Sequence, residues 1–297
     1  MIGHILGAKS ATDVSCRTNA NPTIGMDAIR LSFVVLAAAI GGAINSIAGG
    51  GTLVTFPALV GLGIPAITAN ATSTVALWPG AIGSMYGYRN ELAGARAWAI
   101  RFAIPSLLGG LLGALLLLRT SSERFDEIVP WLVLGATLLF VIQKPLMTAI
   151  RRRYAGGSLE VSGSRSEQAP VAIHEDPATR PPSLPLLLFQ FAIGVYGGYF
   201  GAGIGILMLA ALGFMGFTNI HRMNGLKNWG GLCMNATAAA TFILLGLVNW
   251  PVAIAMALGA TAGGYAGSRL AQRVPQQSVR TVVILIGFTA SAWLFLQ

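Results

Sequence analysis

Apolar residues run through this chain in eight long stretches that short polar segments separate. The stretches cover residues 29–62, 66–88, 97–118, 128–150, 184–216, 223–247, 250–268 and 279–296. A helix needs about 20 apolar residues to cross a bilayer, so six of the stretches predict single membrane-spanning helices. The first and the fifth are longer than one crossing requires, and each predicts a helix that is interrupted near its middle.

Glycines stand at the middle of both longer stretches. The first contains IAGGGTLVTFP, and the second contains YFGAGIGILM with Gly201 in its middle. Each glycine costs a helix about 1 kcal/mol relative to alanine, so three close together predict a break. Three further apolar stretches follow each broken one, and the element order of the first half therefore recurs in the second.

The two halves also match residue by residue at a spacing of 154 positions. Gly49 aligns with Gly203 and Asn70 aligns with Asn224, without a gap between them. Internal repetition with interrupted helices at corresponding places is typical of transporters. The predicted fold is an all-α polytopic membrane protein with two repeats, each a glycine-broken helical segment followed by three helices.

Loop charges favour inverted repeats over parallel ones. The loop after the second element of the first half carries Arg89, Arg96 and Arg101, whereas its counterpart around Asn249–Pro251 carries no charge. In the next loop, three acids accompany the arginines of the first half and none accompanies those of the second. Because basic loops prefer the cytoplasmic side, this reversal indicates that the halves face opposite ways. Inversion requires each broken segment to be a hairpin, since a segment that crossed once would make the repeats parallel.

Two segments fall outside the repeats, which are predicted at residues 29–150 and 184–297. Residues 1–28 are polar and mixed, without the pattern of a signal peptide, and are expected to form a disordered tail. Residues 151–183 are polar and rich in Ser, Gly and Pro. This composition predicts a linker loop between the two repeats.

Composition and charge agree with a membrane protein. Charged residues make up 10% of the 297 residues, against about 25% in soluble domains. The net charge of +9 comes mostly from Lys and Arg between the apolar stretches, as the positive-inside bias requires. We therefore expect a multi-pass protein of a prokaryotic inner membrane with the lipid bilayer as its surroundings and no nucleic-acid partner, and we leave a homo-oligomer open.

The sequence offers little for catalysis or for cation transport. Its three histidines and two cysteines show no catalytic or metal-ligand spacing, so we expect no enzyme activity, no cofactor and no metal. All ten acidic residues lie in tails, loops or helix edges. Without a carboxylate at the bilayer midplane, a cation pump or a cation-selective channel is not expected.

Lys227 lies inside an apolar stretch, in the sequence NIHRMNGLKNWGGLCMN. A cation in the bilayer core is costly and is usually kept because it pairs with something. With no acid in the membrane segments, an anionic substrate is the simplest partner. The alternative is that Lys227, five residues after Arg222, lies close enough to the interface for its ammonium to reach water.

Polar residues form matching helix faces in the two halves. Asn224, Lys227 and Asn228 have the spacing i, i+3 and i+4, which places them on one face, and Asn235 lies two turns further along. The equivalent residues of the first half are Asn70, Ser73 and Thr74. We expect these residues to bind the anion, with helix capping and helix–helix hydrogen bonds as the alternative for the first-half set.

The helix breaks predict a second source of anion ligands. A helix that starts after a break exposes free N–H groups and about +0.5 of a charge at its N-terminus, where anions bind. The residues predicted to contact the anion there are Gly49, Gly50, Gly51, Thr52, Gly203 and Gly205. A tight turn in which the glycines serve packing alone is the alternative.

Three stretches resemble the TauE/SafE family of sulfite exporters: AGGGTLVTFPALVGLGIPAITANATSTVALWPG, YFGAGIGILMLAALG and NGLKNWGGLCMN. The resemblance covers roughly residues 30–296. The second-half glycine motif departs from the family pattern, since it is GAGIG rather than a plain GGG. The resemblance implies transport of a small sulfur-containing anion, such as sulfite, thiosulfate or an organosulfonate.

The predicted function is therefore export of such an anion by alternating access, at a midplane site between the two repeats. An anion channel and a non-transporting membrane scaffold subunit are the alternatives. Because the cell interior is negative, each exported negative charge gains about 2.3 kcal/mol per 100 mV, so no cation site is required. Coupling to protons through Lys227 or His221 stays open.

Overall fold

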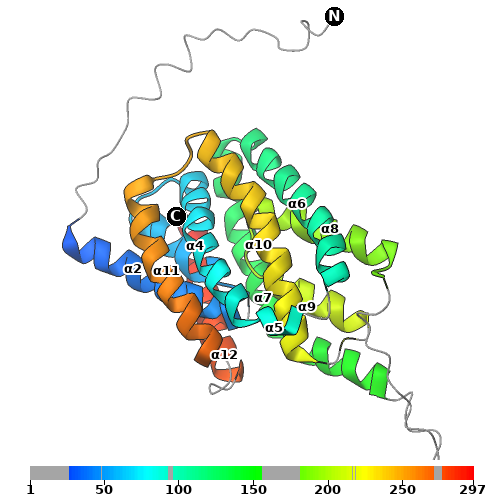
Figure 1. Cartoon of the computed structure of the whole chain (residues 1–297). Coiled ribbons are helices and arrows are strands. Elements are labelled where there is room, and N and C mark those ends of the chain that lie inside the picture. Colours follow the sequence, from blue (N-terminus) through cyan, green and yellow to red (C-terminus); the bar gives the residue numbers. More distant parts are fainter. Residues whose placement is uncertain are drawn as a thin grey trace, which may run out of the picture.

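The computed structural model describes residues 27–47, 49–92, 96–155, 181–215, 217, 219–270 and 276–297. Every regular element within these ranges is a helix, and the helices pack into one bundle (Figure 1). The prediction of an all-α fold is confirmed. The predicted tail and linker fall largely on residues 1–26 and 156–180, outside the described residues, and stay predictions.

The helices follow the apolar stretches of the sequence. The first half contains α2 Ala28–Ile47, α3 Thr52–Gly61, α4 Ala66–Gly87, α5 Arg89–Leu92, α6 Arg96–Arg119 and α7 Ser122–Ala155. The second half contains α8 Leu184–Tyr199, α9 Ile204–Phe214, α10 Ile220–Leu244, α11 Trp250–Leu270 and α12 Gln276–Phe295. Both longer stretches are interrupted, as predicted, and each is divided into two helices at its glycines.

A left-handed glycine stands at each break. Gly49 has φ +79° and Gly203 has φ +75°, values that residues with a side chain rarely adopt. The N–H of Gly49 donates to the carbonyl oxygen of Asn45 at 3.1 Å, which closes the end of α2. A Cβ added to Gly51 would lie 2.3 Å from the carbonyl oxygen of Gly41, so α3 folds back against α2. The first broken segment is thus a hairpin.

Two groups of three long helices run parallel within themselves. In the first group, a Cβ on Gly259 of α11 would lie 2.3 Å from the carbonyl oxygen of Val35, and one on Gly267 would lie 2.6 Å from Cα of Ala43. These contacts advance together along both helices, so α2 and α11 run parallel. α4 packs on α11 in the same direction, because the N–H of Asn249, just before α11, donates to Thr72 Oγ1 at 3.0 Å, and Gly80 and Gly264 approach each other further along both helices. We call this set the α2–α4–α11 group.

The second group consists of α6, α8 and α10. Trp229 Nε1 donates to the carbonyl oxygen of Ala99 at 2.8 Å, and Thr237 Oγ1 donates to that of Leu107 at 3.0 Å. In each of these two pairs the residues are 130 positions apart. The contacts therefore advance together along both helices, and α6 and α10 run parallel. α8 packs on α6 in the same direction through the contacts Gly109–Phe191 and Gly113–Val195. We call this set the α6–α8–α10 group.

The two groups meet along α4 and α10, which run in opposite directions (Figure 1). Trp78 Nε1 donates to the carbonyl oxygen of Leu232 at 3.2 Å, which joins these two helices. Within each group, glycines let the helix backbones approach closely. α7 and α12 form a further, antiparallel pair, in which Ser291 Oγ donates to the carbonyl oxygen of Pro130 at 3.2 Å.

Several helices are long and apolar enough to cross a membrane. Four meet this description by length and composition within the described residues, at Ala28–Ile47, Trp98–Arg119, Ser122–Gln143 and Ser278–Phe295. Many large apolar side chains are exposed on the outside of the bundle, among them Leu188, Ile254 and Leu258. A lipid environment accommodates such surfaces, and the chain is a multi-pass membrane protein.

Candidate functional site

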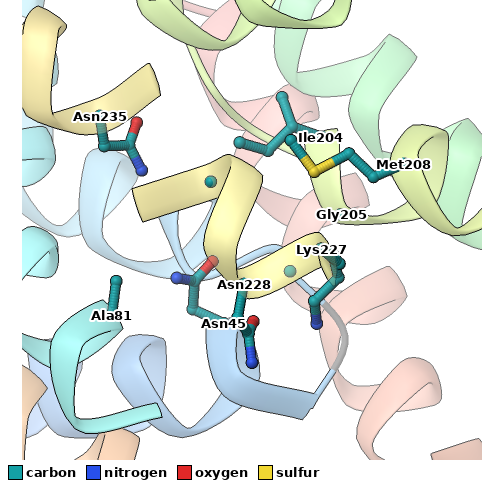
Figure 2. Close-up of a pocket in the computed structure, with 10 residues that line it drawn as sticks. Asn45, Ala81, Ile204, Gly205, Met208, Lys227, Asn228 and Asn235 are labelled. Carbon is teal, nitrogen blue, oxygen red and sulfur yellow. The ribbon is translucent and has the colours of Figure 1, made fainter. Parts of the chain in front are cut away.

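A cavity of about 20 Å³ lies where the two broken segments meet (Figure 2). The end of α2, the first turns of α9, one face of α10 and one residue of α4 form its wall. The lining residues are Asn45, Gly49, Ala81, Ile204, Gly205, Met208, Lys227, Asn228, Gly231 and Asn235. The cavity therefore lies between the α2–α4–α11 group and the α6–α8–α10 group, and α9, which belongs to neither group, forms part of its wall.

The two breaks touch each other at this cavity. A Cβ added to Gly49 would lie 2.6 Å from Cα of Gly205 and 3.1 Å from its nitrogen. Two backbones can approach this closely only because neither residue has a side chain. Gly205 belongs to the first turn of α9, where main-chain N–H groups lack partners within the helix.

Lys227 is the basic residue among those that line the cavity. Its side chain is 3% exposed, and Nζ donates to the carbonyl oxygen of Ser46 at 3.4 Å. An ammonium group has three N–H donors, and this long hydrogen bond is its single polar contact within the described part of the chain. The described acidic side chains Asp27, Glu123, Asp126 and Glu127 are all exposed, so none of them neutralises it.

The burial of Lys227 bears on the alternative that its ammonium reaches water at the interface. A lysine that extends to the surface keeps its charged end exposed, whereas this side chain is enclosed between α10 and the end of α2. The structure therefore places the Lys227 amine inside the protein beside the cavity, and not at the membrane interface.

Asparagine amides surround the same space. Asn45, Asn228 and Asn235 line the cavity (Figure 2), and the buried Nδ2 of Asn228 has no hydrogen-bond partner among the residues that the structure describes. A buried donor without a partner costs about 1–3 kcal/mol. An oxyanion in the cavity would accept from this group and from Lys227 together.

The chain also matches a known family, described as sulfite exporter TauE/SafE, over residues 34–294. The chain belongs to the TauE/SafE family. The family predicted from the glycine and lysine motifs is thereby confirmed. No solved structure matched the chain significantly.

Relatives of this TauE/SafE protein carry transporter names. A Haemophilus influenzae protein named "Probable membrane transporter protein" is 28% identical over 272 residues, which cover 91% of this chain and 95% of the relative. "Probable membrane transporter protein YfcA" of Escherichia coli K12 is 27% identical over 88% of each chain. A Sinorhizobium protein, "Probable membrane transporter protein ORF9", is 28% identical over 86% of this chain and 88% of its own length. The chain is a membrane transporter of the TauE/SafE family.

The polar residues predicted in the first half do not line the cavity of this TauE/SafE transporter. Asn70 Nδ2 donates to the carbonyl oxygen of Tyr199 at 2.9 Å, at the end of α8. Ser73 shares a hydrogen bond of 2.5 Å with the hydroxyl of Thr55, and Thr74 donates to the carbonyl oxygen of Asn70. Asn70 and Ser73 thus link α4 to the two broken segments, whereas the bond of Thr74 lies within α4. Asn224, their counterpart on α10, is buried outside the cavity lining, and its Oδ1 has no partner within the described ranges of the chain.

The predicted glycines divide into two sets. Gly49 and Gly205 line the cavity, whereas the others pack against neighbouring elements. A Cβ added to Gly50 would approach Phe140. One added to Gly51 would approach Gly41, and one added to Gly203 would approach Ala136. Thr52 starts α3, is half-buried, and lies outside the cavity lining.

Five of the residues that line the cavity were not predicted from the sequence: Asn45, Ala81, Ile204, Met208 and Gly231. Asn45 offered a signal, because it is an asparagine in an otherwise apolar helix, four residues before the glycine that ends it. The apolar members offered none, since nothing in the sequence separates them from ordinary core residues.

Proposed function

We propose that this transporter exports a small sulfur-containing anion, namely sulfite, thiosulfate or an organosulfonate, across a prokaryotic inner membrane. One observation carries the proposal: Lys227 is buried beside a cavity with a single long hydrogen bond. An anion would supply the missing charge, and charge-assisted hydrogen bonds to it would be stronger than the bond to Ser46. The restriction to sulfur anions rests on the family to which the chain belongs.

The anion would bind between the two helix groups. Lys227 would neutralise it, and the amides of Asn228, Asn235 and Asn45 would donate hydrogen bonds to its oxygens. The N-terminal end of α9 at Gly205 would add a favourable partial charge. Asn70 and Ser73 would hold the breaks in position instead of contacting the anion.

Inverted repeats are supported by helix starts and helix directions. α4, α6 and α7 start at residues 66, 96 and 122, and α10, α11 and α12 start 154 residues later, at 220, 250 and 276. Matched helices α4 and α10 belong to different groups and run in opposite directions. Trp78 and Leu232, which contact each other, are also 154 residues apart, as expected where a two-fold axis relates two repeats.

Alternating access would use the two helix groups as its moving units. Each group combines helices from both halves of the chain and is joined internally by close glycine contacts. Asn45, Gly49 and Ala81 of the cavity belong to one side, whereas Lys227, Asn228 and Asn235 belong to the other. A relative rotation of the groups would therefore open the cavity first to one side of the membrane and then to the other.

A ligand screen followed by flux measurements tests the proposed function. Purified protein is heated with sulfite, sulfate, thiosulfate, sulfoacetate or taurine, and bound anion should raise the melting temperature. The stabilising anions should then show saturable flux in proteoliposomes. Large passive conductance without saturable exchange would indicate a channel. Absence of both stabilisation and flux would indicate a scaffold subunit and contradict the proposal.

A further inference from the structure

One wall of the cavity is apolar. Ile204 and Met208 lie next to each other on α9, while Lys227, Asn45 and Asn228 lie on another side (Figure 2). Met208 is fully buried and packs within an apolar cluster that contains Phe102 and Leu212. A ligand in this cavity would therefore meet polar groups at one end and an aliphatic and thioether surface at the other.

The cavity is too small for such a ligand as it stands. Its volume of about 20 Å³ accommodates roughly one water molecule. Sulfite has a sulfur and three oxygens, and an organosulfonate adds a carbon chain to this group. We therefore expect part of the wall to move when one of these anions binds.

Among the apolar residues that line the cavity, Met208 has the side chain best suited to move. Gly49 and Gly205 are fixed by backbone contact, Ala81 has no side-chain torsion, and the branched Ile204 is stiff at χ1. Methionine is unbranched with three rotatable bonds and adapts to irregular spaces. Its displacement would enlarge the apolar side of the cavity without disturbing Lys227.

We propose that Met208 determines how large an organic group the transported anion can carry. Its flexible side chain closes the apolar end of the cavity around a small anion and yields to a short alkyl group attached to a sulfonate. A shorter residue at this position would admit longer groups, and a rigid bulky residue would restrict the site to sulfite-sized anions. This inference rests on the proposed function and deepens it.

Competition in proteoliposomes tests the role of Met208. The ratio of propanesulfonate to sulfite flux is measured for the wild type, Met208→Ala, the milder Met208→Val and the bulkier Met208→Phe. One methylene in an apolar pocket discriminates by about 10–200-fold, so Met208→Ala should raise the ratio at least about tenfold. Met208→Phe should lower it by a similar factor. Met256→Ala is the matched control, because Met256 is equally buried but lies in α11, away from the cavity.

The outcomes separate this inference from the proposed function. If the wild type transports sulfite and the variants that fold keep its flux ratio, or if Met256→Ala changes the ratio equally, the role of Met208 is refuted and the export function stands. If the wild type neither binds nor transports any sulfur anion, the export function itself fails, and the inference fails with it.

Discussion

Nζ of Lys227 lies 3.4 Å from the carbonyl oxygen of Ser46, so a buried ammonium on α10 contacts the last turn of α2. The contact joins the two helix groups at the edge of the cavity. A neutral carbonyl at this distance gives the ammonium little compensation for its lost hydration. An anion that entered the cavity would replace this weak contact by a stronger one and would draw on residues from both groups.

A negative charge at Asn45 should prevent anion binding. Asn45→Asp keeps the shape of the side chain but places a carboxylate in the cavity, where it would compensate Lys227 and repel the substrate. We expect the ligand-induced rise in melting temperature to disappear. Asn249→Asp is the matched control, because Asn249 accepts from the N–H of Val252 at the start of α11, a role that aspartate also fills. Equal ligand affinity in wild type and Asn45→Asp would contradict the proposal that Asn45 contacts the anion.

A methyl group at Gly231 should stabilise the protein and impair transport. An added Cβ there meets no heavy atom within 4 Å, and alanine favours a helix over glycine by about 1 kcal/mol. The methyl group would, however, occupy the wall of the cavity. Gly135→Ala in α7 has equally open surroundings and lies outside the cavity, so it should stabilise without a loss of flux. Transport unchanged in Gly231→Ala would contradict a substrate site at this wall.

Cross-linking should distinguish moving helix groups from moving sequence halves. In a background with Cys16 and Cys233 replaced by serine, Leu107→Cys and Thr237→Cys join α6 to α10 within one group. Trp78→Cys and Leu232→Cys join α4 to α10 across the two groups. A short, reducible cross-linker should leave flux intact in the first pair and stop it in the second until reductant is added. Leu107 and Thr237 lie in different halves of the chain. If cross-linking this pair stopped flux, the result would instead indicate that the two sequence halves are the moving units.

Membrane potential should drive export. The electrical energy of a monovalent anion falls by about 2.3 kcal/mol when it leaves a compartment whose interior is negative by 100 mV. Imposing this potential on loaded proteoliposomes with a potassium ionophore should therefore accelerate efflux, and reversing it should retard efflux. The same measurement with a pH gradient and no potential is the control. Efflux that followed the pH gradient alone would indicate proton coupling in place of the proposed potential-driven export.

Much of the fold follows from the hydrophobic pattern. The boundaries of α4, α6 and α11 lie close to those of their apolar stretches. Pro65 and Asn249 stand directly before the starts of α4 and α11 and mark in the sequence where these helices begin. The breaks were predictable for a similar reason, since Gly49 and Gly203 occupy backbone conformations that glycine favours. Helix directions and groups were less accessible, because they depend on contacts between residues more than 100 positions apart, such as Trp229 and Ala99.

The candidate site was predictable only in part. Lys227 and Asn228 were identifiable because polar groups are rare inside apolar helices, and both line the cavity. Asn70 carried the same signal, yet its amide bonds to the main chain of α8. Sequence spacing places a residue on a helix face, but it does not determine whether that face meets a cavity or another backbone. Met208 could be assigned to the wall only from the fold.

The most direct test of the central claim is sulfur-anion affinity in Lys227→Met. Methionine keeps the length of the side chain and removes its amine, and with it the cost of burying a charge that has no charged partner. We therefore expect a folded protein whose melting temperature no longer responds to the anion that stabilises the wild type. Loss of a buried charge partner costs about 2–5 kcal/mol, which corresponds to at least about thirtyfold in affinity. Wild-type affinity in Lys227→Met would contradict the role of Lys227 as the counter-ion of the substrate.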